Sequence, residues 1–249
     1  MSTARTTRSE PIPEANRVGA EPIVHDKSPP LRHFRELNLW LKTDKRPDIS
    51  KDTVAKLFVS HARLKVAKRF DGVRMRRASQ NLIRGYTAGM RLLLCYSAAE
   101  SMGEAIGEKV TTWEITDEPL LVPLRRLAAP LPDRSDILHK HIREQVANFI
   151  FHKHDNIRVV ATALRHLMAH GHFTPTGAGA MTNAGSDAIE TLSKHLVAET
   201  ERRFAEWFNK IHKAATTTAG KSVVNHADSV LYSQLLALQE PHLPDVAII

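Results

Sequence analysis

Residues Ile157 to Thr174 read IRVVATALRHLMAHGHFT, and this stretch carries both the main fold signal and the candidate chemistry. Apolar residues recur through its first part at the spacing of a helix. Gly171 predicts the end of that helix, because glycine is the favoured residue just past a helix C-terminus. The sequence therefore predicts a core helix whose last turn holds Arg165, His166 and His170.

The composition favours helices packed on helices and an anionic partner. Of the 249 residues, 42% are hydrophobic and only 6% are aromatic. The single cysteine, Cys95, excludes a disulfide framework or a thiolate zinc site within one chain. The formal net charge of +8 favours nucleic acid first and an anionic membrane surface second, beside the alternative of a merely basic protein. Without a long apolar run or a secretory signal, we expect a cytoplasmic protein with no membrane partner.

Helical periodicity covers most of the remaining chain and predicts an all-α protein. Ser50 is the expected N-cap of a helix over 51–70, and Asp155 that of the helix containing Arg165. A long helical run over 73–106 is expected to be interrupted around Gly85 and Gly89. Residues 107–118 predict a loop with a short extended segment, and a β-hairpin arm is the alternative. Further helices are expected over 31–42, 120–128, 136–153, 186–214 and 228–239.

Arg165 and His170 form a pair that suits chemistry at a phosphate. Five residues advance a helix by about 500°, so the two side chains meet only if the helix ends near His170. Arginine offers a fixed fork of donors to phosphate oxygens, and histidine can give and take a proton near neutral pH. The alternative is an ordinary pair of cations that complement the dipole at a helix C-terminus.

The residues RHLMAHG at 165–171 resemble the signature of the HEPN superfamily, helical domains of toxin–antitoxin and phage-defence systems. Arg165 matches the arginine of that signature, His166 its polar position and His170 its catalytic histidine. The resemblance implies an antiparallel bundle of four to five core helices over residues 86–215. It also implies a metal-independent endoribonuclease, a nuclease that acts as a homodimer with a composite cleft, possible antitoxin or defence-system partner proteins, and antiviral defence. Some relatives keep the fold as non-catalytic RNA-binding or protein-binding modules, which is the alternative function.

Around this bundle we expect a tail over residues 1–29, an N-terminal helical extension over 30–85, and a linker, short helix and tail over 216–249. Basic residues of the extension are candidate RNA contacts, or else a solvated helix face. Glu100 or Glu104 is a candidate to orient Arg165 or a histidine of the motif, and a solvated carboxylate is the favoured alternative. The candidate substrate-binding residues are His172, Arg69, Arg74, Arg76 and Arg77.

A metal centre is the remaining alternative for the histidines. His166 and His170 are spaced i,i+4, as in some zinc sites. No acidic residue lies within the motif, however, and the two His-Lys-His runs place a cation between their histidines. We therefore expect no metal and no other cofactor.

Overall fold

The computed structural model describes residues 31, 33–43, 49–134, 136–176, 180 and 182–219. The expected tail at 1–29 and the expected helix at 228–239 lie outside this range. The described elements are α1 (Phe34–Trp40), α2 (Lys51–Arg69), α3 (Gln80–Ile106), the 3₁₀ turn η1 (Val110–Thr112), α4 (Glu118–Ala128), α5 (Lys140–Ile150), α6 (Arg158–Ala169) and α7 (Asn183–Ala219). No strand occurs in these residues, which confirms the all-α prediction.

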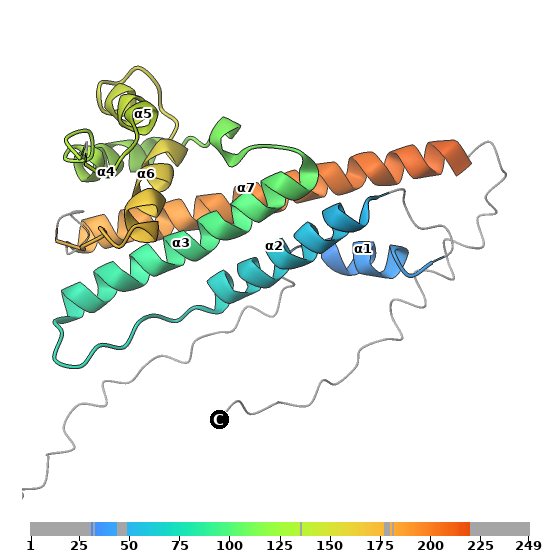
Figure 1. Cartoon of the computed structure of the whole chain (residues 1–249), viewed down its shortest axis with the longest axis horizontal. Helices are drawn as coiled ribbons and strands as arrows, with labels where there is room; N and C mark the ends of the chain where they lie inside the picture. The colour runs from blue at the N-terminus through green and yellow to red at the C-terminus, as the bar shows by residue number, and fades with distance from the viewer. Residues whose placement is uncertain are drawn as a thin grey trace, which may run out of the picture.

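Two long helices, α3 and α7, form the centre of the molecule, and α2 lies along the other side of α3 (Figure 1). Ion pairs join Arg84 to Asp187 and Arg91 to Glu190, so α3 and α7 run parallel. Helix α2 is antiparallel to α3. Ser60 in the middle of α2 donates to the Ala98 carbonyl, whereas the Phe70 carbonyl just past its end accepts from Arg91, which lies earlier in α3. Helix α2 belongs to the expected N-terminal extension and not to the expected bundle. Within the bundle, the parallel course of α3 and α7 departs from the expected antiparallel arrangement.

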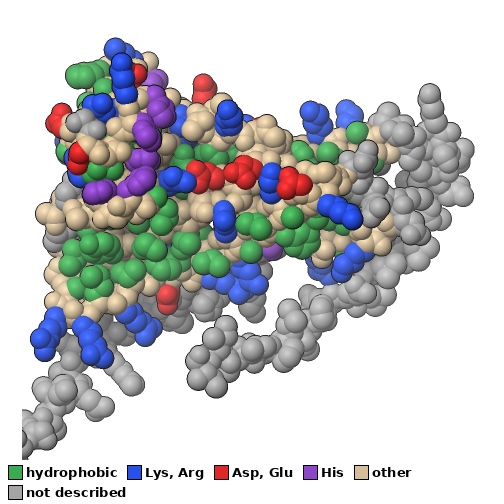
Figure 2. All heavy atoms as spheres, viewed as in Figure 1, with side chains coloured by type: hydrophobic (Ala, Val, Ile, Leu, Met, Phe, Trp, Pro, Cys, Tyr) green, Lys and Arg blue, Asp and Glu red, His purple; other side chains and the backbone are tan. Residues whose placement is uncertain are grey.

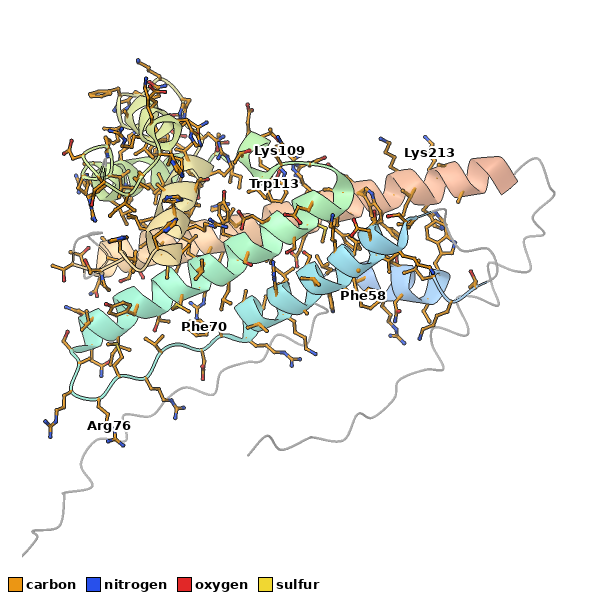
Figure 3. The ribbon with its side chains drawn as sticks, viewed as in Figure 1. Phe58, Phe70, Arg76, Lys109, Trp113 and Lys213 are labelled. Carbon is orange, nitrogen blue, oxygen red and sulfur yellow. The ribbon has the colours of Figure 1, made fainter. Side chains whose placement is uncertain are left out.

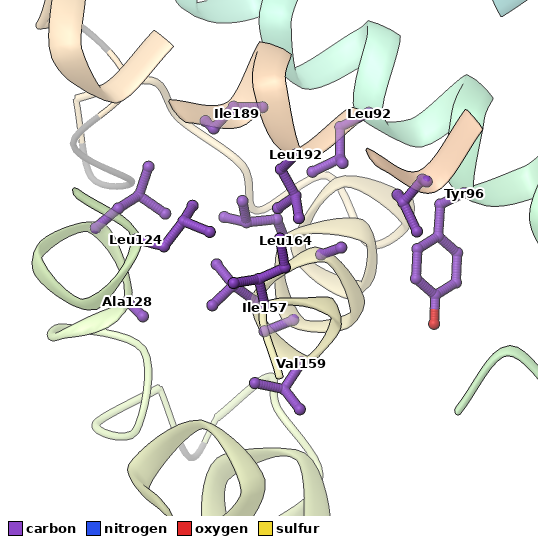
Figure 4. Packing of buried hydrophobic residues seen from close by; sticks show 14 of the residues in the cluster. Leu92, Tyr96, Leu124, Ala128, Ile157, Val159, Leu164, Ile189 and Leu192 are labelled. Carbon is purple, nitrogen blue, oxygen red and sulfur yellow. The ribbon is translucent and has the colours of Figure 1, made fainter. Parts of the chain in front are cut away.

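The shorter helices α4, α5 and α6 form a lobe over the N-terminal halves of α3 and α7 (Figure 1). A hydrophobic cluster joins this lobe to the long helices through residues such as Leu92, Leu164 and Leu192, with Tyr96 at its edge (Figure 4). A second cluster, which includes Phe34, Leu57 and Phe204, fixes α1 and α2 against the other end of α3 and α7.

Helix α3 continues without a break through Gly85 and Gly89, so the expected interruption is wrong. Both glycines permit close packing. A Cβ atom at Gly85 would lie 2.6 Å from Pro175, and one at Gly89 would lie 2.8 Å from the ring of Phe173. The missing side chains therefore let the segment after α6 approach the backbone of α3.

Several predicted helix boundaries also change. Ser50 caps α2 as expected, its hydroxyl accepting from the Thr53 N–H. Asp155 does not cap α6 but pairs with Arg125, and Ile157 occupies the N-cap position. Helix α5 begins later than expected, at Lys140, and α7 extends beyond both expected ends. Residues 107–118 contain the turn η1 and no hairpin, and residue 86, the expected start of the bundle, lies inside α3.

Candidate functional site

The C-terminus of α6 ends in a backbone arrangement that sets the direction of the candidate motif. Gly171 has a φ of +71°, the left-handed conformation that glycine adopts at little cost. Its N–H bonds to the Met168 carbonyl at 3.1 Å, and the His172 N–H bonds to the Leu167 carbonyl at 2.8 Å. These two bonds make a Schellman motif and confirm that the helix stops where the sequence predicts.

Arg165 lies on the side of α6 that faces α3. Its Nη2 donates to Glu100 Oε2 at 2.9 Å, and the two side chains are 34% and 37% exposed. The guanidinium also lies 5.9 Å from the centre of the Tyr96 ring. Because only one of its nitrogens bonds to Glu100, the arginine is oriented and keeps donors for a ligand. A role for Glu100 in orienting Arg165 is thus consistent with its position.

A buried chain of hydrogen bonds lies behind Arg165. The Tyr96 and Thr162 hydroxyls are 2.9 Å apart, Arg158 Nη1 donates to Thr162 at 3.1 Å, and Arg158 Nε donates to the Trp113 carbonyl at 3.0 Å. Arg158 is only 3% exposed and makes no ion pair with a described carboxylate. Burial lowers the pKa of Arg158 and raises the pKa of Tyr96. This chain holds α3, α6 and the segment after η1 together at the site.

Helical periodicity in the sequence predicts only the α6 side of this hydrogen-bond network. Arg158, Thr162 and Arg165 do follow the i, i+4, i+7 spacing of one helix face, which is a usable signal. Their partners on α3 and near η1 are far away in the sequence.

His166 is nearly buried and has a fixed orientation. Its Nε2 lies 3.0 Å from the Ile137 carbonyl, so Nε2 carries the proton and Nδ1 is the acceptor in the neutral ring. Burial is the main cause that lowers the pKa of His166, and the nearby His170, His139 and Arg165 act in the same direction. The neutral form is therefore favoured at the centre of the motif.

His170 contacts His166 rather than Arg165. The two imidazole rings are 4.4 Å apart, whereas no hydrogen bond or ring contact joins His170 to Arg165 within the described chain. The expected turn of His170 towards Arg165 is therefore not realised in this conformation. Arg165 and His170 nonetheless lie at the end of the same helix. His170 and His172 are both exposed.

Histidines from the start of α5 extend the motif into a column. His139 lies 5.2 Å from His166, and His141 lies 6.1 Å from His139. Figure 2 shows histidine side chains gathered over α5 and α6. In the described part of the chain, no three His, Cys, Asp or Glu side chains are arranged to hold a metal ion. The proximity of the first His-Lys-His run to the motif is not predictable from sequence spacing.

The basic residues expected to bind substrate do not lie beside Arg165. Arg69 ends α2, and Arg74, Arg76 and Arg77 follow in the exposed loop before α3, where Arg76 projects away from the body (Figure 3). This loop contacts α3 at Thr87, whose hydroxyl accepts from the Val73 N–H at 3.2 Å. Thr87 is on the opposite side of α3 from the glycines that face the segment after α6.

An exposed face of α3 separates the two cationic regions. Tyr86, Met90, Leu93 and Ser97 follow helical spacing along this face, and each is partly exposed. Figure 2 shows hydrophobic side chains between the histidine column above and the Lys and Arg side chains at the lower edge. A polyanion that reached both regions would have to cross this face.

No family model, curated protein or solved structure matches this chain. None of the helices in the described residues is long and apolar enough to cross a bilayer.

Proposed function

We propose that this chain is a metal-independent endoribonuclease of the HEPN type, acting in a toxin or antiviral-defence system. The observation that carries the proposal is the end of α6, where Glu100 holds a partly exposed Arg165 and His170 is exposed nearby. In metal-free RNA cleavage, a cation with free donors can stabilise charge on the phosphoryl group, and an accessible imidazole can transfer a proton.

In the proposed reaction, the 2′-oxygen attacks the adjacent phosphorus and the bond from phosphorus to the 5′-oxygen breaks. His170 either removes the proton from the 2′-OH or delivers a proton to the leaving 5′-oxygen. Arg165 stabilises the negative charge on the phosphoryl oxygens. His166, fixed by the Ile137 carbonyl, limits the positions open to the His170 ring. The products are a 2′,3′-cyclic phosphate and a 5′-hydroxyl.

The reaction needs both a base and an acid, whereas each copy of the RHLMAH motif has a single exposed histidine, His170. We therefore propose a homodimer in which His170 of each copy performs one proton transfer. Light scattering should give the mass of a dimer, and a strict monomer that still cleaves RNA would contradict the composite site. A cytoplasmic location and a partner protein of the defence system complete the proposal.

RNA cleavage in EDTA tests the catalytic assignment. Arg165→Ala and His170→Ala should each lower the cleavage rate at least about 100-fold, in line with the loss of a charge-stabilising or proton-transfer group. Arg126→Ala and His152→Asn are matched controls, because both residues are exposed and lie outside the motif. Equal cleavage by all variants, or loss of wild-type cleavage in EDTA, would exclude this mechanism.

A non-catalytic RNA-binding or protein-binding module is the second candidate. The observation in its favour is that Arg165 contacts Glu100 and Tyr96 but not His170. This alternative predicts RNA binding without cleavage and no cyclic phosphate product.

A further inference from the structure

A surface with several apolar side chains, interrupted by Arg63, runs along the outer sides of α2 and α3, and we name it the α2–α3 strip. On α2 it contains Val59 and Val66, which are 45% and 54% exposed. On α3 it contains Met90 and Leu93, neither of which packs into the two hydrophobic clusters. Arg63 of α2 donates to the Ser97 carbonyl of α3 at 3.3 Å, so the two helix faces adjoin. Hydrophobic side chains are visible along this part of the molecule in Figure 2.

Four arginines lie at one end of the strip. Arg69 at the end of α2 and Arg74, Arg76 and Arg77 in the next loop form no ion pair with described residues. An occupant that suits this surface has an apolar side next to carboxylates and has few cations of its own.

The sequence beyond α7 has this chemistry. Residues 222–249 contain Asp228, Glu240 and Asp245 but no Lys or Arg, in a chain whose net charge is +8. Between these acids, Leu231, Leu235 and Leu238 follow the spacing of one helix face. We propose that residues 228–239 of the same chain bind the α2–α3 strip as an amphipathic helix, with Glu240 directed towards Arg69.

The length of the chain permits this contact. Arg203 pairs with Glu108 near the end of α3, and α7 continues from there to Ala219, about 24 Å further. Ser60 donates to the Ala98 carbonyl, so Val59 lies about 15 Å back along α3 from Glu108. Residues 220–228 in extended form span about 30 Å, and a helix over 229–239 adds about 16 Å. Such a helix, running antiparallel to α3, brings Leu235 near Val59 and Leu238 towards Val66.

This contact gives the proposed function a regulator, and that part of the inference rests on the proposed function. Glu240 beside Arg69 occupies one of the cations that would hold RNA phosphates. The bound segment is therefore an intramolecular competitor of RNA.

Disulfide trapping in the full chain tests the contact without RNA. The double variant Val59→Cys/Leu235→Cys is compared with Val122→Cys/Leu235→Cys, because Val122 on α4 is similarly exposed at 57% and lies in the other lobe. The native Cys95 gives little background, since burial raises the pKa of its thiol to about 12. We expect the Val59 pair to oxidise within one chain at least about tenfold faster than the control pair.

Two further measurements decide the result. Oxidation of mixed ¹⁵N-labelled and unlabelled protein separates bonds within a chain from bonds between chains. Hydrogen exchange on chains with only the native cysteine compares Leu235→Asp with Leu243→Asp, and only Leu235→Asp should speed exchange over residues 59–70. Equal oxidation rates, bonds only between chains, or unchanged exchange would overturn the proposal. Loss of RNA cleavage alone would overturn the proposed function and leave the contact standing.

Discussion

Tyr96 connects the candidate site to the core through a single hydroxyl. Its side chain is buried and its oxygen pairs with Thr162, so Tyr96→Phe leaves the partly buried Thr162 hydroxyl with one hydrogen bond fewer. We expect a loss of about 1–2 kcal/mol in the free energy of unfolding, measured by urea denaturation. Tyr86→Phe is the control, because the Tyr86 hydroxyl forms no hydrogen bond with a described residue, and it should change stability by less than about 0.5 kcal/mol. Equal losses for both variants would contradict this role.

His166 should make stability depend on pH. Burial lowers the pKa of His166 in the folded state, so the unfolded chain takes up the proton first as the pH falls. The stabilisation is complete above about pH 6.5, the ordinary pKa of histidine, and declines as the pH falls towards the lower pKa of the folded state. His166→Gln keeps a donor for the Ile137 carbonyl without this titration.

Denaturation between about pH 7.5 and 5.5 should therefore show a smaller decline for His166→Gln than for the wild type. Some decline should remain, because burial also lowers the pKa of His61. An unchanged pH profile in the variant would show that His166 does not contribute.

At the scale of single residues, the sequence identifies candidate functional groups better than it identifies the partners of their side chains. Arg165 and Glu100 are predictable because few charged residues interrupt the apolar helices. The hydrogen bonds of Arg158 with Thr162 and of His166 with the Ile137 carbonyl are not predictable, because the groups involved meet only when the helices pack.

The C-terminus of α6 depends on the left-handed conformation of Gly171. A Cβ atom added at Gly171 would meet open space, so Gly171→Ala should cost only the strain of a positive φ, about 1 kcal/mol in the free energy of unfolding. Gly171→Asn should recover part of this loss, since asparagine tolerates the left-handed conformation better. Thermal or urea denaturation of the three proteins checks the order. A loss with asparagine as large as with alanine would point to another cause.

Helix positions follow from periodicity, but breaks and caps depend on packing. Glycine is a poor helix former, and on that ground the sequence predicts breaks at Gly85 and Gly89. In the structure both glycines instead admit Pro175 and Phe173 against α3. At Asp155, the carboxylate pairs with Arg125 on α4, and this tertiary contact outweighs the local capping preference.

The charge distribution of the whole molecule predicts how RNA binding responds to salt. Replacing Arg74, Arg76 and Arg77 by alanine should reduce the slope of log affinity against log salt by about 2, since each phosphate contact with single-stranded RNA contributes about 0.7. A control that replaces Lys109, Lys153 and Lys210 removes the same charge from other exposed positions. Titration of RNA at several salt concentrations checks both. Equal slopes in the two triple variants would mean that the loop is not a specific contact surface.

The helical class is accessible from the sequence because apolar residues recur at helical spacing in nearly every segment. The parallel course of α3 and α7 is not, since it depends on the route by which α4, α5 and α6 connect them. The separation of the loop arginines from Arg165 also depends on packing. The loop before α3 and the helix α6 contact different sides of α3, and sequence spacing does not show this.

The two hydrophobic clusters share the same two long helices, and this has a consequence for heating. Ala99 of α3 and Leu196 of α7 belong to one cluster, and Met102 and Phe204, about one or two turns further along, belong to the other. Melting one cluster would therefore fray the helices that support the other. Calorimetry should show a single transition with equal calorimetric and van't Hoff enthalpies, and two resolved transitions would mean that the ends melt independently.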